Sequence, residues 1–166
     1  MTPVTTTIGS PIGPLTLTAE DDAITGLQMH RQRHAPPVDP GCVRDDAAFG
    51  DVAEQLAAYF SGELREFDVH VSFAGTAFQH RVWGALREIP YGETISYGEL
   101  ARRVGNPKAS RAVGLATGRN PVAVIVPCHR VVGADGSLTG FGGGIERKVW
   151  LLEHEDAVVG GRRRER

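Results

Sequence analysis

Residues 120–131 read NPVAVIVPCHRV, an apolar, β-branched run followed by a cysteine, a histidine and an arginine. The run at 122–126 predicts a short buried strand, and Pro127 should end it because proline has no N–H for a ladder hydrogen bond. Cys128 is then held at the end of a rigid element. Neighbouring His and Arg side chains favour the nucleophilic thiolate. The alternative is a plain buried cysteine that acts as a small hydrophobe.

Further motifs surround this stretch on both sides. They are FQ at 78–79 with Trp83, IPYGET at 89–94, SY at 96–97, RAVG at 111–114, GRNP at 118–121, GFGGG at 140–144 and KVWLLEHE at 148–155. Together with PCHRV at 127–131, these motifs resemble the signature of the O6-alkylguanine-DNA alkyltransferases. The resemblance covers essentially the whole C-terminal half, whereas the N-terminal half matches mainly through SPIG at 10–13.

The N-terminal part predicts a small antiparallel sheet with one helix. Apolar, β-branched segments joined by short links predict a meander of three strands, at 4–8, 15–19 and 24–29. Residues 30–46 lack periodicity and predict a loop, helical spacing predicts a helix at about 47–60, and alternation at 67–71 predicts a fourth strand. We expect residues 1–75 to form an α/β domain of ribonuclease H-like type.

The C-terminal part predicts mostly helices. Thr76 with Gln79, and Ser96 with Glu99, are capping-box pairs that open helices ending near residues 88 and 104. Further helices are expected at 108–117 and 145–155. Two helices joined by a short turn with glycine form a helix-turn-helix, so residues 76–159 should be a winged-helix-like catalytic and DNA-binding domain. Residues 160–166 predict a disordered basic tail, and the fold class is α+β.

The helix expected at 108–117 has small side chains, including Ala109, Ser110 and Gly114, and one arginine, Arg111. A helix that reads the major groove would present long polar side chains to base edges. Small residues instead let a helix press into a narrow groove, which favours minor-groove docking with little sequence readout. A tightly packed internal helix is the alternative.

Charge is divided unevenly along the chain. Residues 1–75 carry 4 Lys and Arg against 11 Asp and Glu, a net of −7, whereas residues 76–166 carry 14 against 9, a net of +5. A basic half favours a polyanionic partner, although the arginines of the tail supply much of the excess. No segment predicts a membrane span or a secretory signal. The two cysteines predict neither a disulfide framework nor a metal site, and a reducing, cytoplasmic setting fits a working thiol.

Cys128, His129 and Glu155 provide a nucleophile, a base and an orienting carboxylate, which is the logic of a catalytic triad. Adjacent Cys and His side chains rarely face each other, so we expect a water molecule between them. A glutamate near a C-terminus is usually a solvated helix residue, and the match to the family pattern is what favours Glu155 over Glu153. From the sequence, Glu155→Gln is expected to keep the fold and slow the chemistry.

The resemblance implies the remaining roles. Tyr97 would give a proton to the guanine ring, Asn120 would hold the elements beside Cys128, and Arg111 would fill the space that a flipped base leaves. The implied substrate contacts are the carbonyl of Val131, Phe141, the N–H of Gly142, and Lys148. The implied DNA contacts are Thr94, Tyr97, Ala109, Ser110, Arg111 and Gly114. Many relatives carry tyrosine where this chain has Phe141, so any hydroxyl hydrogen bond is lost there.

The resemblance also implies the reaction, in which the alkyl group of O6-alkylguanine in double-stranded DNA moves to Cys128. A thioether has no easy hydrolytic exit, so each molecule should act once and need no cofactor. We expect a monomer, and cooperative binding to DNA and activity on O4-alkylthymine are left open. Two alternatives remain. A helix-turn-helix regulator would bind an operator without forming a covalent product, and a cysteine hydrolase would turn over through an acyl intermediate.

Overall fold

The computed structural model describes residues 2–33, 37–138 and 141–160. Its N-terminal part is a four-stranded sheet formed by β1 (Val4–Ile8), β2 (Leu15–Glu20), β3 (Ala23–Met29) and β4 (Val43–Arg44). The order is β3-β2-β1-β4. The predicted antiparallel meander is confirmed for β1 to β3, but β4 runs parallel to β1 and makes the sheet mixed. The two-residue strand β4 lies in the segment predicted to be a loop, and it is too short for a periodic signal.

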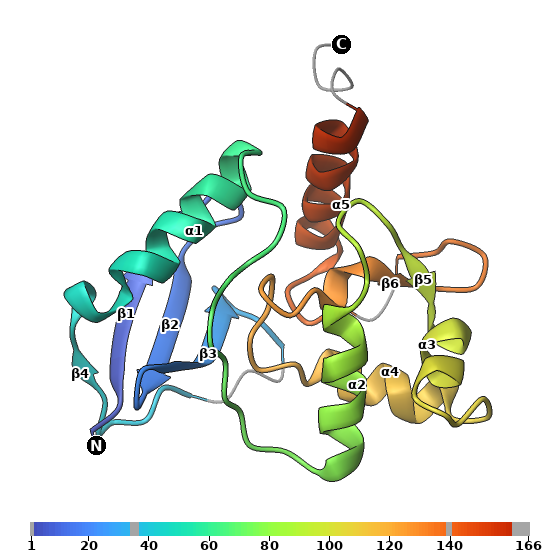
Figure 1. Cartoon of the computed structure of the whole chain (residues 1–166), viewed down its shortest axis with the longest axis horizontal. Helices are drawn as coiled ribbons and strands as arrows, with labels where there is room; N and C mark the ends of the chain where they lie inside the picture. Colours follow the sequence, from blue (N-terminus) through green and yellow to red (C-terminus); the bar gives the residue numbers. More distant parts are fainter. Residues whose placement is uncertain (1, 34–36, 139–140, 161–166) are drawn as a thin grey trace.

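A short 3-10 helix, η1 (Asp46–Phe49), leads into α1 (Gly50–Ser61), which covers one face of the sheet (Figure 1). The apolar face of α1 buries Val52, Leu56 and Tyr59. Gly62 ends the helix in a left-handed conformation with φ of 88°, which glycine adopts without a steric penalty. The predicted helix at 47–60 is therefore confirmed to within a few residues.

The C-terminal part consists mainly of four helices, α2 (Ala77–Arg87), α3 (Tyr97–Arg103), α4 (Ser110–Gly118) and α5 (Ile145–Gly160). Two short strands, β5 (Ile95–Ser96) and β6 (Val131–Val132), pair in parallel. Helices α3 and α4 form the predicted helix-turn-helix, and Figure 1 shows α2 beside them. Helix α5 extends past the predicted end at residue 155 to Gly160. Residues 161–166 of the predicted tail, and Gly140 of the glycine-rich motif, lie outside the described residues.

The predicted helix starts at Thr76 and Ser96 are confirmed. Thr76 forms the complete capping box, in which its side chain accepts from the Gln79 N–H and the Gln79 side chain accepts from the Thr76 N–H. Ser96 accepts from the Glu99 N–H, but the Glu99 carboxylate pairs with Arg102 and Arg103. Local side chains thus determine where both helices begin.

Two predicted strands are wrong. Residues 122–126 form consecutive turns with φ of 69° at Val124, and the only ladder contact there in the described chain is an isolated bridge between Val122 and Leu27. The side chain of Asn120 takes the place of a strand partner, because it bonds to both Val122 and Val126. Residues 67–70 have no regular secondary structure, and Val71 forms one isolated bridge, with Ile24.

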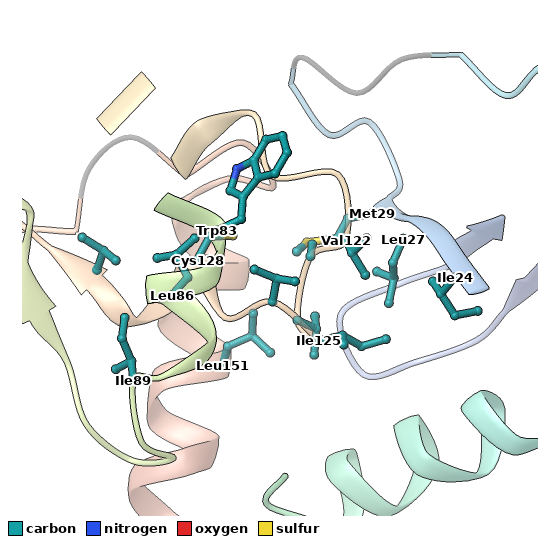
Figure 2. Close-up of a cluster of buried hydrophobic side chains, with 14 of the residues drawn as sticks. Ile24, Leu27, Met29, Trp83, Leu86, Ile89, Val122, Ile125, Cys128 and Leu151 are labelled. Atoms are coloured by element: carbon teal, nitrogen blue, oxygen red, sulfur yellow. The ribbon is translucent and has the colours of Figure 1, made fainter. Parts of the chain in front are cut away.

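One continuous apolar core joins the two parts of the chain. Its members come from the sheet, the helices and the turns at 122–126, and Figure 2 draws Leu27, Leu86, Ile125, Cys128 and Leu151 among them. The backbone adds two hydrogen bonds across this junction, since Leu27 N–H donates to the Pro121 carbonyl and Ala123 N–H donates to the Leu27 carbonyl. The apolar run before the cysteine therefore anchors it between the sheet and the helices.

Candidate active site

Cys128 begins a single 3-10 turn, η2 (Cys128–Arg130), directly after Pro127. Its side chain is nearly enclosed, with the residue 7% exposed. Burial raises the pKa of the Cys128 thiol, and this effect outweighs the opposing Asn120 hydrogen bond and Lys148 charge. The expectation that neighbouring His and Arg side chains hold a thiolate is wrong for the free protein, in which Cys128 is a thiol that needs a base.

Asn120 shapes the approach to the thiol. Its Nδ2 donates to the Val126 carbonyl at 2.8 Å, and its Oδ1 accepts from the Val122 N–H at 3.0 Å. The same side chain also acts on Cys128, since its polar interaction lowers the pKa of the thiol and partly opposes the effect of burial. Asn120 therefore closes the turns that precede the cysteine, rather than a strand.

His129 is fully buried, and its Nε2 lies 2.7 Å from Glu155 Oε2. Because a carboxylate can only accept, Nε2 carries the proton and Nδ1 of the neutral ring keeps its lone pair. Nδ1 makes no hydrogen bond within the described part of the chain. Burial lowers the pKa of His129 despite the neighbouring carboxylate. A neutral imidazole whose Nδ1 lone pair is not engaged in a hydrogen bond is the form that can accept a proton.

Glu155 on α5 is the most heavily bonded group of the site. Its carboxylate accepts from Arg130 at 2.8 Å (Nε) and 3.0 Å (Nη2), from Tyr59 Oη at 2.6 Å, and from the Gly92 N–H at 3.3 Å. Burial would raise the pKa of Glu155, but the His129 and Arg130 interactions outweigh it and hold that pKa well below its usual range. The carboxylate is therefore ionised and paired with Arg130.

The sequence analysis placed Arg130 beside Cys128 but did not predict that Arg130 and Tyr59 bind Glu155. Arg130 stands in the PCHRV motif, and a buried arginine requires an acidic partner, so its pairing with Glu155 had a signal in the sequence. Its third bond, from Nη1 to the Ile89 carbonyl at 2.7 Å, had no signal in the sequence. Tyr59 precedes Glu155 by 96 residues and gave no local signal.

A small cavity of about 10 Å³ lies beside the thiol, room for about one water molecule. Tyr97, Asn120, Phe141, Gly142 and Lys148, all predicted site residues, line it. Met29, Gln32, Thr117, Gly118, Ala123 and Gly143 complete the lining around Cys128. The structure thus brings six predicted residues together, Cys128 included.

Lys148 contacts other groups around this cavity. Its ammonium donates to the Val131 carbonyl at 2.6 Å and lies 6.0 Å from the Tyr97 ring and 5.9 Å from the Phe141 ring. The Val131 carbonyl predicted to read the base is thus already bonded, although a carbonyl oxygen can accept a second hydrogen bond. Burial, together with the nearby cysteine, raises the pKa of Tyr97, which keeps its hydroxyl protonated.

An open groove leads from the cavity to the surface of α4. The predicted residues Ser110, Arg111 and Gly114 line it, and so do Arg33, Leu115 and Arg119, which were not predicted. Leu115 is 67% exposed. Ala109 lies just before α4 as its N-cap residue, and Thr94 is exposed in the loop before β5, outside the groove lining. The groove thus combines small side chains and Arg111 of α4, which the sequence predicted, with Arg33 and Arg119 from outside α4 and with the large side chains of Tyr97, Leu115 and Phe141.

Comparison with known proteins agrees with this geometry. Residues 77–157 match the family profile described as 6-O-methylguanine DNA methyltransferase, DNA binding domain, and residues 4–73 match the ribonuclease-like domain of the same family. The chain belongs to the 6-O-methylguanine DNA methyltransferase family. These two matches fall on either side of the predicted boundary at residue 75, and they cover the α+β architecture.

Several relatives within the methyltransferase family align over nearly the whole chain. The methylated-DNA–protein-cysteine methyltransferase of Mycobacterium tuberculosis is 57% identical over 154 residues, covering 90% of each chain, and that of Methanosarcina acetivorans is 50% identical over 146 residues, covering 88% of this chain and 94% of the relative. The crystal structure of the M. tuberculosis protein OGT in complex with DNA superposes with a TM-score of 0.89 at 56% identity, covering 93% of each chain.

Residues 2–33, 37–138 and 141–160 contain no cluster of three or more His, Cys, Asp or Glu side chains that could hold a metal ion. Over the same ranges, none of the helices combines the length and the apolar character that a membrane span requires.

Proposed function

We propose that this protein repairs DNA by moving the alkyl group of O6-alkylguanine to Sγ of Cys128, once per molecule. The observation that carries the proposal is the buried thiol followed directly by a neutral histidine whose Nε2 is held by Glu155. The family membership and the similarity to a DNA-bound relative support DNA as the partner. A reducing compartment such as the cytoplasm suits a thiol that must stay free.

The reaction forms one bond and breaks one. Because the Cys128 and His129 side chains do not face each other, one water molecule relays the thiol proton to His129 Nδ1. The resulting thiolate Sγ then attacks the alkyl carbon. The carbon–O6 bond breaks, and the guanine anion takes a proton from Tyr97. Release of the thiol proton from His129 and uptake of one proton by Tyr97, both exchanged with solvent, return the two side chains to their neutral forms. The thioether that remains on Cys128 ends the reaction without a cofactor.

A nucleobase flipped out of the duplex would reach Cys128 from the open groove, because Tyr97, Gly118, Phe141 and Gly142 line both the groove and the cavity beside the thiol. The Arg33 N–H donates to the Gly142 carbonyl at 2.7 Å at this entrance. Arg111 on α4 lines this groove and would enter the duplex there, filling the space that the base leaves.

Intact mass spectrometry after mixing with duplex DNA that contains O6-methylguanine tests the proposal. We expect each protein molecule to gain the mass of one methylene unit, and peptide mapping to place it on Cys128. Cys128→Ser should gain nothing and Cys42→Ser should react normally, since Cys42 lies outside the site. Repeated turnover, as in a hydrolase, or DNA binding without a covalent product, as in a regulator, would contradict it. Duplexes with O4-methylthymine test the second substrate.

A further inference from the structure

Tyr59 brings the N-terminal domain into direct contact with the Glu155 carboxylate. It lies near the end of α1, and its side chain is fully buried at 0% exposure. Its hydroxyl donates to Glu155 Oε2 at 2.6 Å, across a separation of 96 residues. The sheet domain therefore supplies a hydrogen-bond donor to a carboxylate that otherwise serves the C-terminal domain.

Two bonds to successive residues of α5 fix Tyr59 in this position. Besides the hydroxyl contact to Glu155, the Tyr59 carbonyl accepts from His154 Nε2 at 2.7 Å. Since a carbonyl can only accept, His154 is the donor. The ring packs edge-on against Phe60, Tyr91 and His154, with centroids 5.2, 6.1 and 5.4 Å away. The hydroxyl thus cannot turn away from Glu155 without disturbing the junction of α1 and α5.

Oε2 of Glu155 accepts from three donors, namely His129 Nε2 at 2.7 Å, Arg130 Nη2 at 3.0 Å and Tyr59 Oη at 2.6 Å. Each donor draws on the negative charge of the same oxygen, so the tyrosine weakens the hold of that oxygen on a protonated imidazole. We propose that Tyr59 is a positioning residue for alkyl transfer, whose hydroxyl fixes Oε2 and keeps the proton affinity of His129 low. This inference rests on the proposed function, because it concerns the base of that reaction.

Other ionisable groups around the pair stay in place when only the tyrosine hydroxyl is removed. The charged groups that act on His129 are Glu155 and Lys148 on α5 and Arg130 on the same turn. Lys148 also acts on Cys128, and Tyr91, in the loop after α2, acts on Tyr59. Burial and the Glu155 charge raise the pKa of Tyr59 well above its usual value, so it remains a neutral donor. Tyr59→Phe consequently removes one hydrogen bond and no charge.

The test is a pH profile of Cys128 reactivity in Tyr59→Phe, made in a Cys42→Ser background. Two single-turnover reactions are measured, alkylation by iodoacetamide and transfer from an O6-alkylguanine base. Without the hydroxyl, Oε2 binds the imidazolium more strongly and the pKa of His129 rises, so the acidic limb of both profiles should move to higher pH. Near neutral pH, both rates should fall by about 2- to 10-fold, the range of one hydrogen bond. A 3-fluorotyrosine at residue 59 donates more strongly and should move the limb the other way.

Thr6→Val is the matched control, because it also removes a hydroxyl from the N-terminal domain. That hydroxyl donates to Asp46 Oδ1 at 2.6 Å, and the profile should stay as in the wild type. A Tyr59→Phe profile that superposes on the wild-type profile would overturn the inference, and so would an equal shift in Thr6→Val. The iodoacetamide profile tests the role of Tyr59 even if the protein takes no alkyl group from guanine. Failure to take the alkyl group would refute only the proposed function.

Discussion

At the scale of single residues, Glu155 combines two roles that one substitution affects together. It orients His129, and it is the buried partner of the Arg130 guanidinium, with the two side chains 1% and 8% exposed. The sequence suggested a carboxylate that could be exchanged without harm to the fold. Because removing one member of a buried pair leaves the other charge uncompensated, the structure predicts a different outcome.

Glu155→Gln should lower the free energy of unfolding by about 3–5 kcal/mol, because Arg130 is left buried and unpaired. Transfer should also slow by about 10²–10⁴-fold, the usual range for loss of general-base assistance. Urea unfolding and single-turnover transfer measure the two effects. Glu153→Gln, an exposed change on the same helix, should alter neither. Unchanged stability in Glu155→Gln would show that Arg130 finds another partner.

The same pair sets a dependence of stability on pH. The folded-state pKa of Glu155 is depressed below the ordinary value of 4.5, so its stabilisation is present above that value and is lost as the pH falls through the folded pKa. Wild-type stability should therefore decline more steeply on acidification below about pH 4.5 than that of Glu155→Gln. Urea unfolding midpoints of both proteins between about pH 3 and 7, a range that includes the ordinary pKa values of carboxyl groups, measure this difference. Midpoints that change in parallel with pH in the two proteins would contradict the prediction.

Tyr97→Phe tests the proton that guanine needs as it leaves. Tyr97 lines the cavity next to the thiol, and its raised pKa, caused by burial and the nearby cysteine, keeps it a proton donor. Transfer should slow by about 10²-fold or more for guanine and much less for an alkylated base that leaves easily. Gel-shift affinity for duplex DNA should change little. An equal loss for all leaving groups would point to packing of the ring against Lys148.

At the scale of elements, α4 presents Arg111 to the open groove beside Leu115 and Arg119. Arg111→Ala should impair repair of duplex DNA far more than reaction with the free alkylated base. Flipping the base costs about 2–4 kcal/mol of lost pairing and stacking, and an inserted Arg111 would offset part of that cost. A mismatch opposite the lesion should restore much of the rate. Arg81→Ala on α2, outside this groove, is the control. Normal duplex repair by Arg111→Ala would leave α4 as packing alone.

Elements with local signals were predictable, and those held by distant partners were not. Thr76 and Ser96 predicted helix starts because a cap bonds within three residues. The run at 122–126 was mistaken for a strand because β-branched residues suit burial as well as pairing, and the Asn120 side chain supplies the bonds. In the candidate site, His129 and Glu155 were predicted to interact from the motif pattern, whereas Tyr59 needed the folded chain to reach them.

At the scale of the whole molecule, the sheet and the helices share one core at the Cys128 turns. Leu27→Ala in β3 should therefore destabilise both parts, by about 2–5 kcal/mol for a buried leucine. Thermal unfolding followed by far-ultraviolet circular dichroism and by loss of alkyl transfer to Cys128 should give one coincident transition at a lower Tm. Val43→Ala, at an exposed site in β4, should leave the Tm unchanged. Two separated transitions would show that the parts unfold independently.

Trp83 can report on α4 through its intrinsic fluorescence, because its indole is hydrogen-bonded to that helix. The Trp83 indole N–H is buried and donates to the Ala116 carbonyl at 2.9 Å, and Figure 2 shows the residue in the core cluster with Cys128. The other tryptophan, Trp150, stacks on His154 with ring centroids 4.8 Å apart, at the contact of α5 with Tyr59. Substituting either indole by phenylalanine would separate their fluorescence. The emission of Trp83 would then follow movements of α4, and that of Trp150 would follow the junction between α1 and α5, without an attached dye.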